Sequence, residues 1–193
     1  MADLAVALAY YAGRMRRHKQ RLLVVMPHPD DECFASASTI ARYAAEGATV
    51  CLATMTRGGA GLWNGRQAGD LRQLTDVREL ELRQAARTLG VTFLEIFDYP
   101  DGALEKVEEV EGTRERFLGD IVRCIRVHRP QVVLTFGPEG VYGHTEQQMA
   151  SRLALQAGSV AGGPTRCELE TVGVGDRTRS RSAPKRKNVG ERT

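Results

Sequence analysis

The sequence has no apolar run long enough to cross a membrane. A membrane-spanning helix needs about 18–20 consecutive apolar residues, and no stretch of the 193 residues approaches that length. Residues 1–11 are apolar, but their neighbouring cations follow them instead of preceding them, which is the wrong polarity for a signal peptide. We therefore expect a cytoplasmic protein without a membrane partner, whose N-terminus forms a short amphipathic helix packed on the domain.

Paired cysteines of the CxxC type are also missing. The four cysteines are scattered along the chain, at Cys33, Cys51, Cys124 and Cys167. This spacing favours small, mostly buried thiols in a reducing compartment.

Excess charge of one sign is missing from most of the chain. The formal net charge is +3, but residues 159–193 contain eight basic and four acidic residues, so the rest is close to neutral. This tail has almost no periodic apolar residues, and we expect it to be disordered. Nucleic-acid binding would rest on the charge of the tail alone and is not expected.

What the chain does contain is an alternation of strand-like and helix-like segments. It predicts an α/β domain over residues 1–158, a Rossmann-like three-layer sandwich with a mainly parallel sheet that is truncated at its C-terminus. Residues 57–69 contain five glycines and are expected to form a mobile loop. The predicted strands are 22–26, 49–54, 91–97 and 131–136, and the predicted helices are 31–46, 70–89, 112–128 and 145–157.

A reversal of winding in such a sheet would place the first strand beside the fourth. Ligands bind at the carboxyl ends of the strands where the winding reverses. The topology therefore predicts that the loops 28–32 and 137–147 lie together.

The first of these loops follows an apolar strand and contains a histidine and three acidic residues within five positions, 28–32. His28 and Asp31 have a spacing that suits Zn²⁺, and Asp30 would remain free to take a proton from an activated water. The alternative is that one aspartate only caps the following helix. In the second loop, His144 precedes a helix and could donate to a developing oxyanion, or it could be an ordinary loop histidine.

The segment Pro27-His28-Pro29-Asp30-Asp31-Glu32, followed by Gly143-His144, resembles the PIG-L/LmbE-type family of zinc-dependent N-acetylglucosaminyl de-N-acetylases. The similar region runs from about residue 22 to about residue 157. The resemblance implies that His28 and Asp31 bind zinc, Asp30 is the general base, and His144 stabilises the oxyanion.

The resemblance further implies that Tyr142 assists at the oxyanion, and that Arg78 and Asp101 bind the substrate. Arg78 could instead pair with a neighbouring glutamate on its helix, and Asp101 could hold a turn. The family's third zinc ligand is a histidine, and Gln147 stands at that position. A glutamine carbonyl binds Zn²⁺ less well than imidazole.

The function implied is the metal-dependent removal of an N-acetyl group from an N-acetylglucosamine-type conjugate, a small-molecule partner. The cofactor would be Zn²⁺ or another divalent metal, and a homo-oligomer is compatible with the sequence. A catalytically impaired, sugar-binding relative is the alternative, because Gln147 weakens the metal site. A Mg²⁺-dependent phosphoesterase that does not need His28 is a further alternative.

Overall fold

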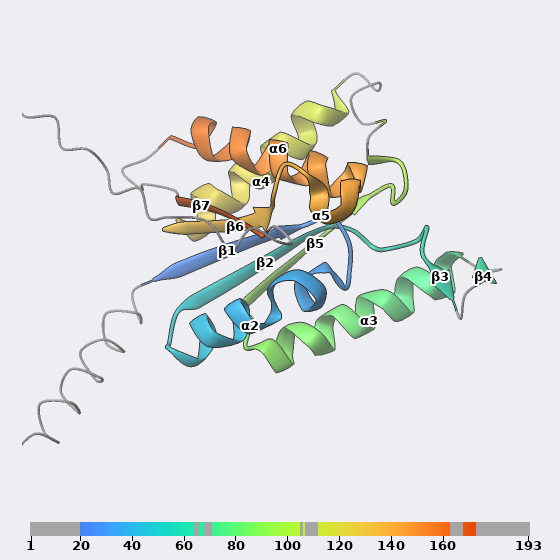
Figure 1. Cartoon of the computed structure of the whole chain (residues 1–193), viewed down its shortest axis with the longest axis horizontal. Coiled ribbons are helices and arrows are strands. Elements are labelled where there is room, and N and C mark those ends of the chain that lie inside the picture. The colour runs from blue at the N-terminus through green and yellow to red at the C-terminus, as the bar shows by residue number, and fades with distance from the viewer. Residues whose placement is uncertain are drawn as a thin grey trace, which may run out of the picture.

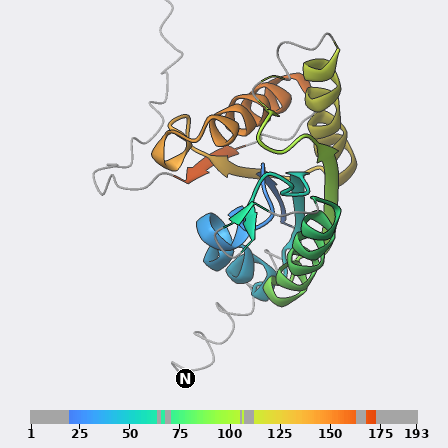
Figure 2. The ribbon, with the colours of Figure 1, turned by 90° about the vertical axis from the view of Figure 1, so that its right-hand side faces the viewer.

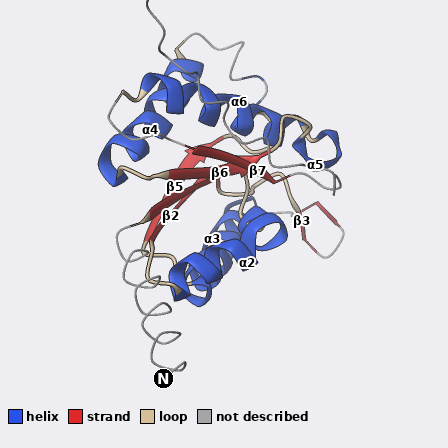
Figure 3. Ribbon diagram, turned by 60° about the vertical axis from the view of Figure 1, so that its left-hand side comes forward, coloured by secondary structure: helices blue, strands red, loops and turns tan. Residues whose placement is uncertain are grey.

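The computed structural model describes residues 20–63, 66–67, 71–104, 106, 112–162 and 168–172 of the chain. These residues form three layers, with one sheet between two sets of helices (Figure 3). The predicted α/β sandwich is thereby confirmed. The helix predicted for residues 1–11 lies outside the described residues.

The sheet is parallel throughout and has the strand order β5-β2-β1-β6-β7 (Figure 1). The first predicted strand therefore lies beside the fourth, as expected from a reversal of winding. The strands are β1 (Arg21–Met26), β2 (Thr49–Thr56), β5 (Phe93–Tyr99), β6 (Val132–Phe136) and β7 (Glu168–Val172).

Residues 168–172, part of the tail that the sequence predicts to be disordered, form strand β7 in the structure. Residues 168–172 pair in parallel with β6, in the register Val132↔Glu168 to Phe136↔Val172. Without β7, β6 would be an edge strand with unpaired backbone groups, and the short alternation in residues 168–172 suits a strand there. Residues 163–167 and 173–193 lie outside the described residues.

The helices cover both faces of the sheet (Figure 1). On one face lie α2 (Asp31–Ala45) and α3 (Leu71–Leu89), and on the other lie α4 (Thr113–His128) and α6 (Thr145–Val160), which is preceded by the short α5 (Gly140–Gly143). A small antiparallel hairpin, β3 (Leu62–Trp63) with β4 (Arg66–Gln67), occupies part of the predicted glycine-rich loop. Within the described residues, no helix has the length and apolar character needed to span a membrane.

Strand β1 is apolar at nearly every position because both of its faces are buried. Leu23 and Val25 pack with α4 and α6, whereas Leu22, Val24 and Met26 pack with α2 and α3. All five side chains are at most 2% exposed. The two apolar cores fix the register of β1 and hence the position of the loop that follows it.

Candidate active site

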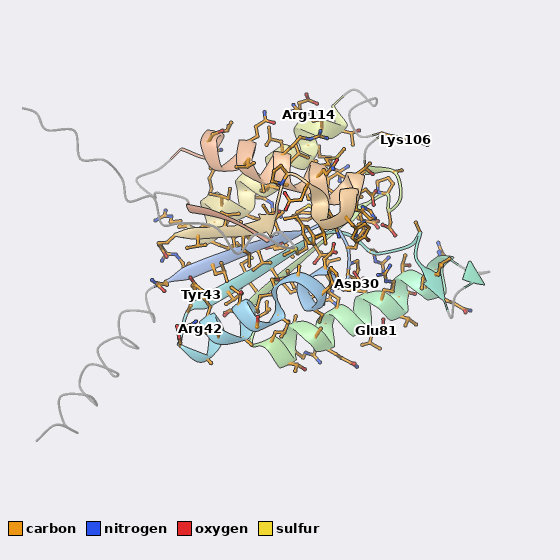
Figure 4. All side chains as sticks on the ribbon, viewed as in Figure 1. Asp30, Arg42, Tyr43, Glu81, Lys106 and Arg114 are labelled. Carbon is orange, nitrogen blue, oxygen red and sulfur yellow. The ribbon has the colours of Figure 1, made fainter. Side chains whose placement is uncertain are left out.

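All eight site residues named from the sequence line one cavity. Its volume is about 1010 Å³, and the loops that follow β1 and β6 contribute to its wall together with α3. Figure 2 views the ribbon from the end at which the β3–β4 hairpin lies, and Figure 4 labels Asp30 at the start of α2 and Glu81 on α3, two residues of the cavity wall. The eight are His28, Asp30, Asp31, Arg78, Asp101, Tyr142, His144 and Gln147.

His28 and Asp31 are held against each other where β1 leads into α2. Asp31 Oδ2 accepts the backbone N–H of His28 at 3.0 Å and lies 3.1 Å from His28 Nδ1. The two residues are 9% and 3% exposed. Two ligands bound to Zn²⁺ at 2.0–2.1 Å in a tetrahedral site are about 3.3 Å apart. The pair therefore needs little movement to share one metal ion.

The other nitrogen of His28 meets a carboxylate that the sequence analysis did not assign. His28 Nε2 lies 2.6 Å from Glu146 Oε2 and 3.4 Å from Asp101 Oδ1. Glu146 is buried, and its Oε1 accepts the backbone N–H of Leu104 at 2.8 Å. From the sequence, Glu146 is only a substitute for the missing third ligand, one that would need local distortion to reach the metal.

These acidic neighbours determine the charge of His28. Burial alone would lower the pKa of His28, but hydrogen bonds with Asp31 and Glu146 and the charges of Asp31 and Asp101 raise it to about 10. Burial would raise the pKa of Glu146, but its hydrogen bonds with His28 and Leu104 dominate and lower it. Three carboxylates thus converge on one imidazole, an arrangement that needs a positive charge at its centre.

Asp30 adopts a strained backbone conformation beside this cluster. Its φ is 115°, a left-handed value that costs a non-glycine residue about 1–3 kcal/mol. Although Asp30 occupies the N-cap position of α2, its side chain makes no capping hydrogen bond, so the capping alternative is not supported. Its backbone N–H donates instead to Glu32 Oε2 at 3.0 Å.

The carboxylate of Asp30 is 69% exposed and faces the cavity. Partial desolvation raises the pKa of Asp30, and the nearby Arg78 guanidinium opposes that rise. A carboxylate with a raised pKa is a better proton acceptor than an ordinary aspartate.

Arg78 contacts Asp30 and does not pair with a glutamate on its own helix. Its Nη2 donates to Asp30 Oδ2 at 2.8 Å and to the carbonyl of Pro29 at 2.6 Å, and its Nη1 donates to the carbonyl of Gly58 at 2.9 Å. The adjacent Glu79 pairs with Arg57 and Arg83 instead.

Asp101 links two loops and does not serve only its own turn. Its Oδ2 accepts the backbone N–H of Ala60 at 2.6 Å, while Oδ1 faces His28 at 3.4 Å. Asp101 thereby ties the loop after β2 to the His28 cluster.

His144 lies at the N-cap of α6, next to the acidic cluster. Its ring centroid is 5.0 Å from that of His28, and its Nδ1 is buried without a hydrogen-bond partner among the described residues. Tyr142 is 73% exposed, with its ring centroid 6.0 Å from that of His144. A buried imidazole nitrogen without a partner is free to bind a substrate oxygen or a metal ion.

Gln147 reaches the cluster from the first turn of α6. Its Nε2 donates to Asp31 Oδ1 at 3.0 Å, and its Oε1 is buried and has no partner in the described part of the chain. Rotation of the amide would turn this oxygen toward Asp31 Oδ1. Two acceptor oxygens repel each other, so a cation between them would be needed to hold this arrangement. In addition, ligand atoms of His28, His144 and Glu146 all lie within 4.8 Å of one another. The residues around His28 therefore fit a divalent cation such as Zn²⁺.

Comparison with known proteins supports the resemblance seen in the motif. Residues 23–158 match the PIG-L family, described as GlcNAc-PI de-N-acetylase. The chain is 36% identical over 180 residues to a 1D-myo-inositol 2-acetamido-2-deoxy-alpha-D-glucopyranoside deacetylase of Streptomyces scabiei, covering 85% of this chain and 56% of that protein. The chain thus spans little more than half the length of this relative.

Solved structures also share the fold. The N,N'-diacetylchitobiose deacetylase of Pyrococcus horikoshii superimposes with a TM-score of 0.62 at 26% identity, over 72% of this chain and 49% of that one. The 4-carboxy-2-hydroxymuconate hydratase GalB of Pseudomonas putida has a TM-score of 0.64 at 23% identity, over 76% and 59%. Because the second similarity concerns the fold alone, the reaction has to be inferred from the residues of the site.

Proposed function

Because this chain belongs to the PIG-L family of GlcNAc-PI de-N-acetylases, we propose that it removes the N-acetyl group from an N-acetylglucosamine-type conjugate. The observation that carries the proposal is the cavity in which Asp30 lies with the His28–Asp31 pair and His144. These residues supply the proton acceptor, the cation site and the oxyanion donor that amide hydrolysis needs. The cytoplasm is the proposed compartment. Cys33 is exposed and forms no disulfide in the structure, and a reducing compartment would keep its thiol in that state.

His28 and Asp31 would hold a Zn²⁺ ion or a similar divalent metal, with a third donor from Gln147 or Glu146. When bound, the ion supplies a Lewis acid for the amide carbonyl and lowers the pKa of the water that attacks it. The buried carboxylates around His28 favour any cation, whereas the imidazole favours Zn²⁺ over Mg²⁺.

The chain's own residues move the protons. Asp30 takes a proton from water as the water oxygen attacks the acetamide carbon. His144 donates a hydrogen bond to the oxygen that becomes negative, and Tyr142, at the exposed side of His144, assists there. Asp30 then returns its proton to the nitrogen as the C–N bond breaks, which leaves acetate and a free amine.

Two other functions are less well supported. A catalytically impaired relative would explain Gln147, but the Streptomyces relative and the Pyrococcus horikoshii enzyme are named as deacetylases, and Glu146 adds an anionic side chain to the site. A Mg²⁺-dependent phosphoesterase would not need His28, whereas His28 lies at the centre of the cluster, in contact with Asp31, Asp101 and Glu146.

The zinc-loaded full chain should release primary amine from N-acetylglucosaminyl-inositol or N,N'-diacetylchitobiose, measured with fluorescamine. The Asp30→Asn variant, which keeps the shape of the side chain but cannot accept the proton, is the control and should lose about 10²–10⁴-fold in rate. Absence of amine release from both substrates by folded, zinc-loaded protein would refute the proposal. Equal rates for Asp30→Asn would refute the role of Asp30.

A further inference from the structure

Arg78 directs three of its N–H groups at Asp30 and at the backbone beside it. Both N–H groups of its Nη2 are used, one by Asp30 Oδ2 and one by the Pro29 carbonyl, while Nη1 is bonded to the Gly58 carbonyl. The Arg78 side chain is 17% exposed, whereas that of Asp30 is 69% exposed. The part of the pair that is open to the cavity is therefore the carboxylate.

Side chains fix both polar groups of the peptide that precedes Asp30. Arg78 binds the carbonyl of Pro29, and Glu32 Oε2 accepts the N–H of Asp30. These contacts sit at the residue with φ 115°, a conformation that persists only where its surroundings impose it. Among the described residues, Asp30 Oδ1 accepts no hydrogen bond, so one oxygen is held while the other is left for a reacting water.

The loop after β2 leaves space for this guanidinium through two glycines. A Cβ on Gly58 or on Gly61 would lie 2.5 Å from Arg78 Nη1. Gly58 has a φ of +71°, which favours glycine in any case, but Gly61 has no positive φ. At Gly61 the close approach to Arg78 is therefore the reason for glycine.

We infer that Arg78 is a positioning residue that orients the Asp30 carboxylate for proton transfer, through one bond to the carboxylate and one to the preceding peptide. The inference rests on the proposed deacetylase function. It differs from the substrate-binding role that the family resemblance implies, because substrate could bind Nη2 only by breaking the contact with Asp30. A lysine at this position would make a single-point contact and could not span Pro29, Gly58 and Asp30 together.

The test compares Arg78→Met, Arg78→Lys, Gly61→Ala and the control Gly59→Ala in the full-length, zinc-loaded chain. A Cβ at Gly59 meets Thr75 Cγ2 at 3.2 Å and does not approach Arg78. Because misplacing a catalytic group by about 1 Å costs up to about 10²-fold in rate, we expect Arg78→Met to lower kcat by about 10–10²-fold. KM and zinc affinity should change by less than about threefold, and Arg78→Lys should recover only part of the loss.

Gly61→Ala tests the same contact without removing the arginine. The guanidinium is the flexible end of a side chain and can move, so the fold should persist while kcat falls, and Gly59→Ala should match the wild type. In the Arg78→Met background, Gly61→Ala should have little further effect, because both changes act on one contact. A rise in KM with unchanged kcat in Arg78→Met, or full additivity of the two changes, would overturn the inference.

A crystal structure of metal-free Arg78→Met makes the inference testable without activity. We expect Asp30 to leave the left-handed region or its carboxylate to turn away from its wild-type position. If the wild type releases no amine, the proposed function fails, and the structure of the variant alone then decides whether Arg78 positions Asp30. An unmoved Asp30 would refute the inference even in an active enzyme.

Discussion

Replacing Gln147 with histidine tests which side chain completes the metal site. Gln147 is 3% exposed, and its amide nitrogen lies 3.0 Å from Asp31 Oδ1, while His28 Nδ1 lies 3.1 Å from the other oxygen of Asp31. Both distances are close to the roughly 3.3 Å expected between two ligands of a tetrahedral Zn²⁺ ion. An imidazole on the same backbone would therefore reach the ion that His28 and Asp31 bind.

The expected gain is at least about hundredfold in Zn²⁺ affinity, or about 2.8 kcal/mol at 1.4 kcal/mol for each factor of ten. The physical reason is that a nitrogen ligand replaces a weak amide oxygen, and a catalytic zinc site normally has three protein ligands. The substitution also removes the hydrogen bond between Gln147 and Asp31, which destabilises the metal-free protein by about 1 kcal/mol. Because the metal-free state is less stable, the apparent Zn²⁺ affinity rises further. Deacetylase activity should rise with it.

The assay is zinc competition against a chromophoric chelator, with Gln148→His as the matched control. Gln148 is on the same helix, but its Nε2 donates to the carbonyl of Glu139, away from Asp31. Equal affinities for wild type and a correctly folded Gln147→His protein would refute the reasoning. The third ligand would then already be present, and Glu146, 2.6 Å from His28 Nε2, is the residue that could supply it.

Four further outcomes are expected. His28→Ala should abolish stoichiometric Zn²⁺ binding in equilibrium dialysis; retained binding of one ion per chain would contradict the ligand assignment. Glu146→Gln should weaken zinc binding by about 10–100-fold in the same chelator assay, and an unchanged affinity would remove Glu146 from the site. Phe117→Ala, which empties a fully buried position in contact with Tyr99, should lower the free energy of unfolding in urea by about 3–5 kcal/mol. Backbone amides within 168–172 should exchange slowly with deuterium because β7 pairs with β6; unprotected exchange would contradict that pairing.

The sheet could be predicted from the sequence because buried parallel strands and their covering helices have strong patterns. The apolar run of β1 and the glycines that end α2 and α3 give elements whose bounds differ by only a few residues from the predicted ones. Strand β7 was missed because five residues within a charged, glycine-containing tail give a weak signal, and pairing with β6 supplies what local sequence does not. The β3–β4 hairpin was missed because its very short strands, within a glycine-rich segment, also give a weak signal.

The site was predictable as far as the motif and the topology reach. The spacing of His28 and Asp31 and the reversal of winding were enough to bring His144 and Gln147 to the same cavity. The contact between His28 and Glu146 joins residues 118 positions apart, and it depends on side-chain conformations that no sequence pattern specifies. The contact between Arg78 and Asp30 spans 48 positions, and only the structure distinguishes it from a pair on the helix surface.

The acidic cluster also explains how the chain can keep a cation site without the third histidine. Asp31 and Glu146 approach His28 from the first turns of α2 and α6, and Asp101 approaches it from the segment after β5. Their mutual repulsion would separate these segments unless a positive charge lies between them. In the metal-free state a proton on the His28 ring supplies that charge, because the neighbouring carboxylates raise the pKa of His28. Two opposite unit charges 4 Å apart attract by about 4 kcal/mol at an effective dielectric constant of 20, and the attraction doubles for a divalent ion. The carboxylate of Glu146 can therefore offset much of what Gln147 fails to contribute, which favours a functional metal site over a remnant.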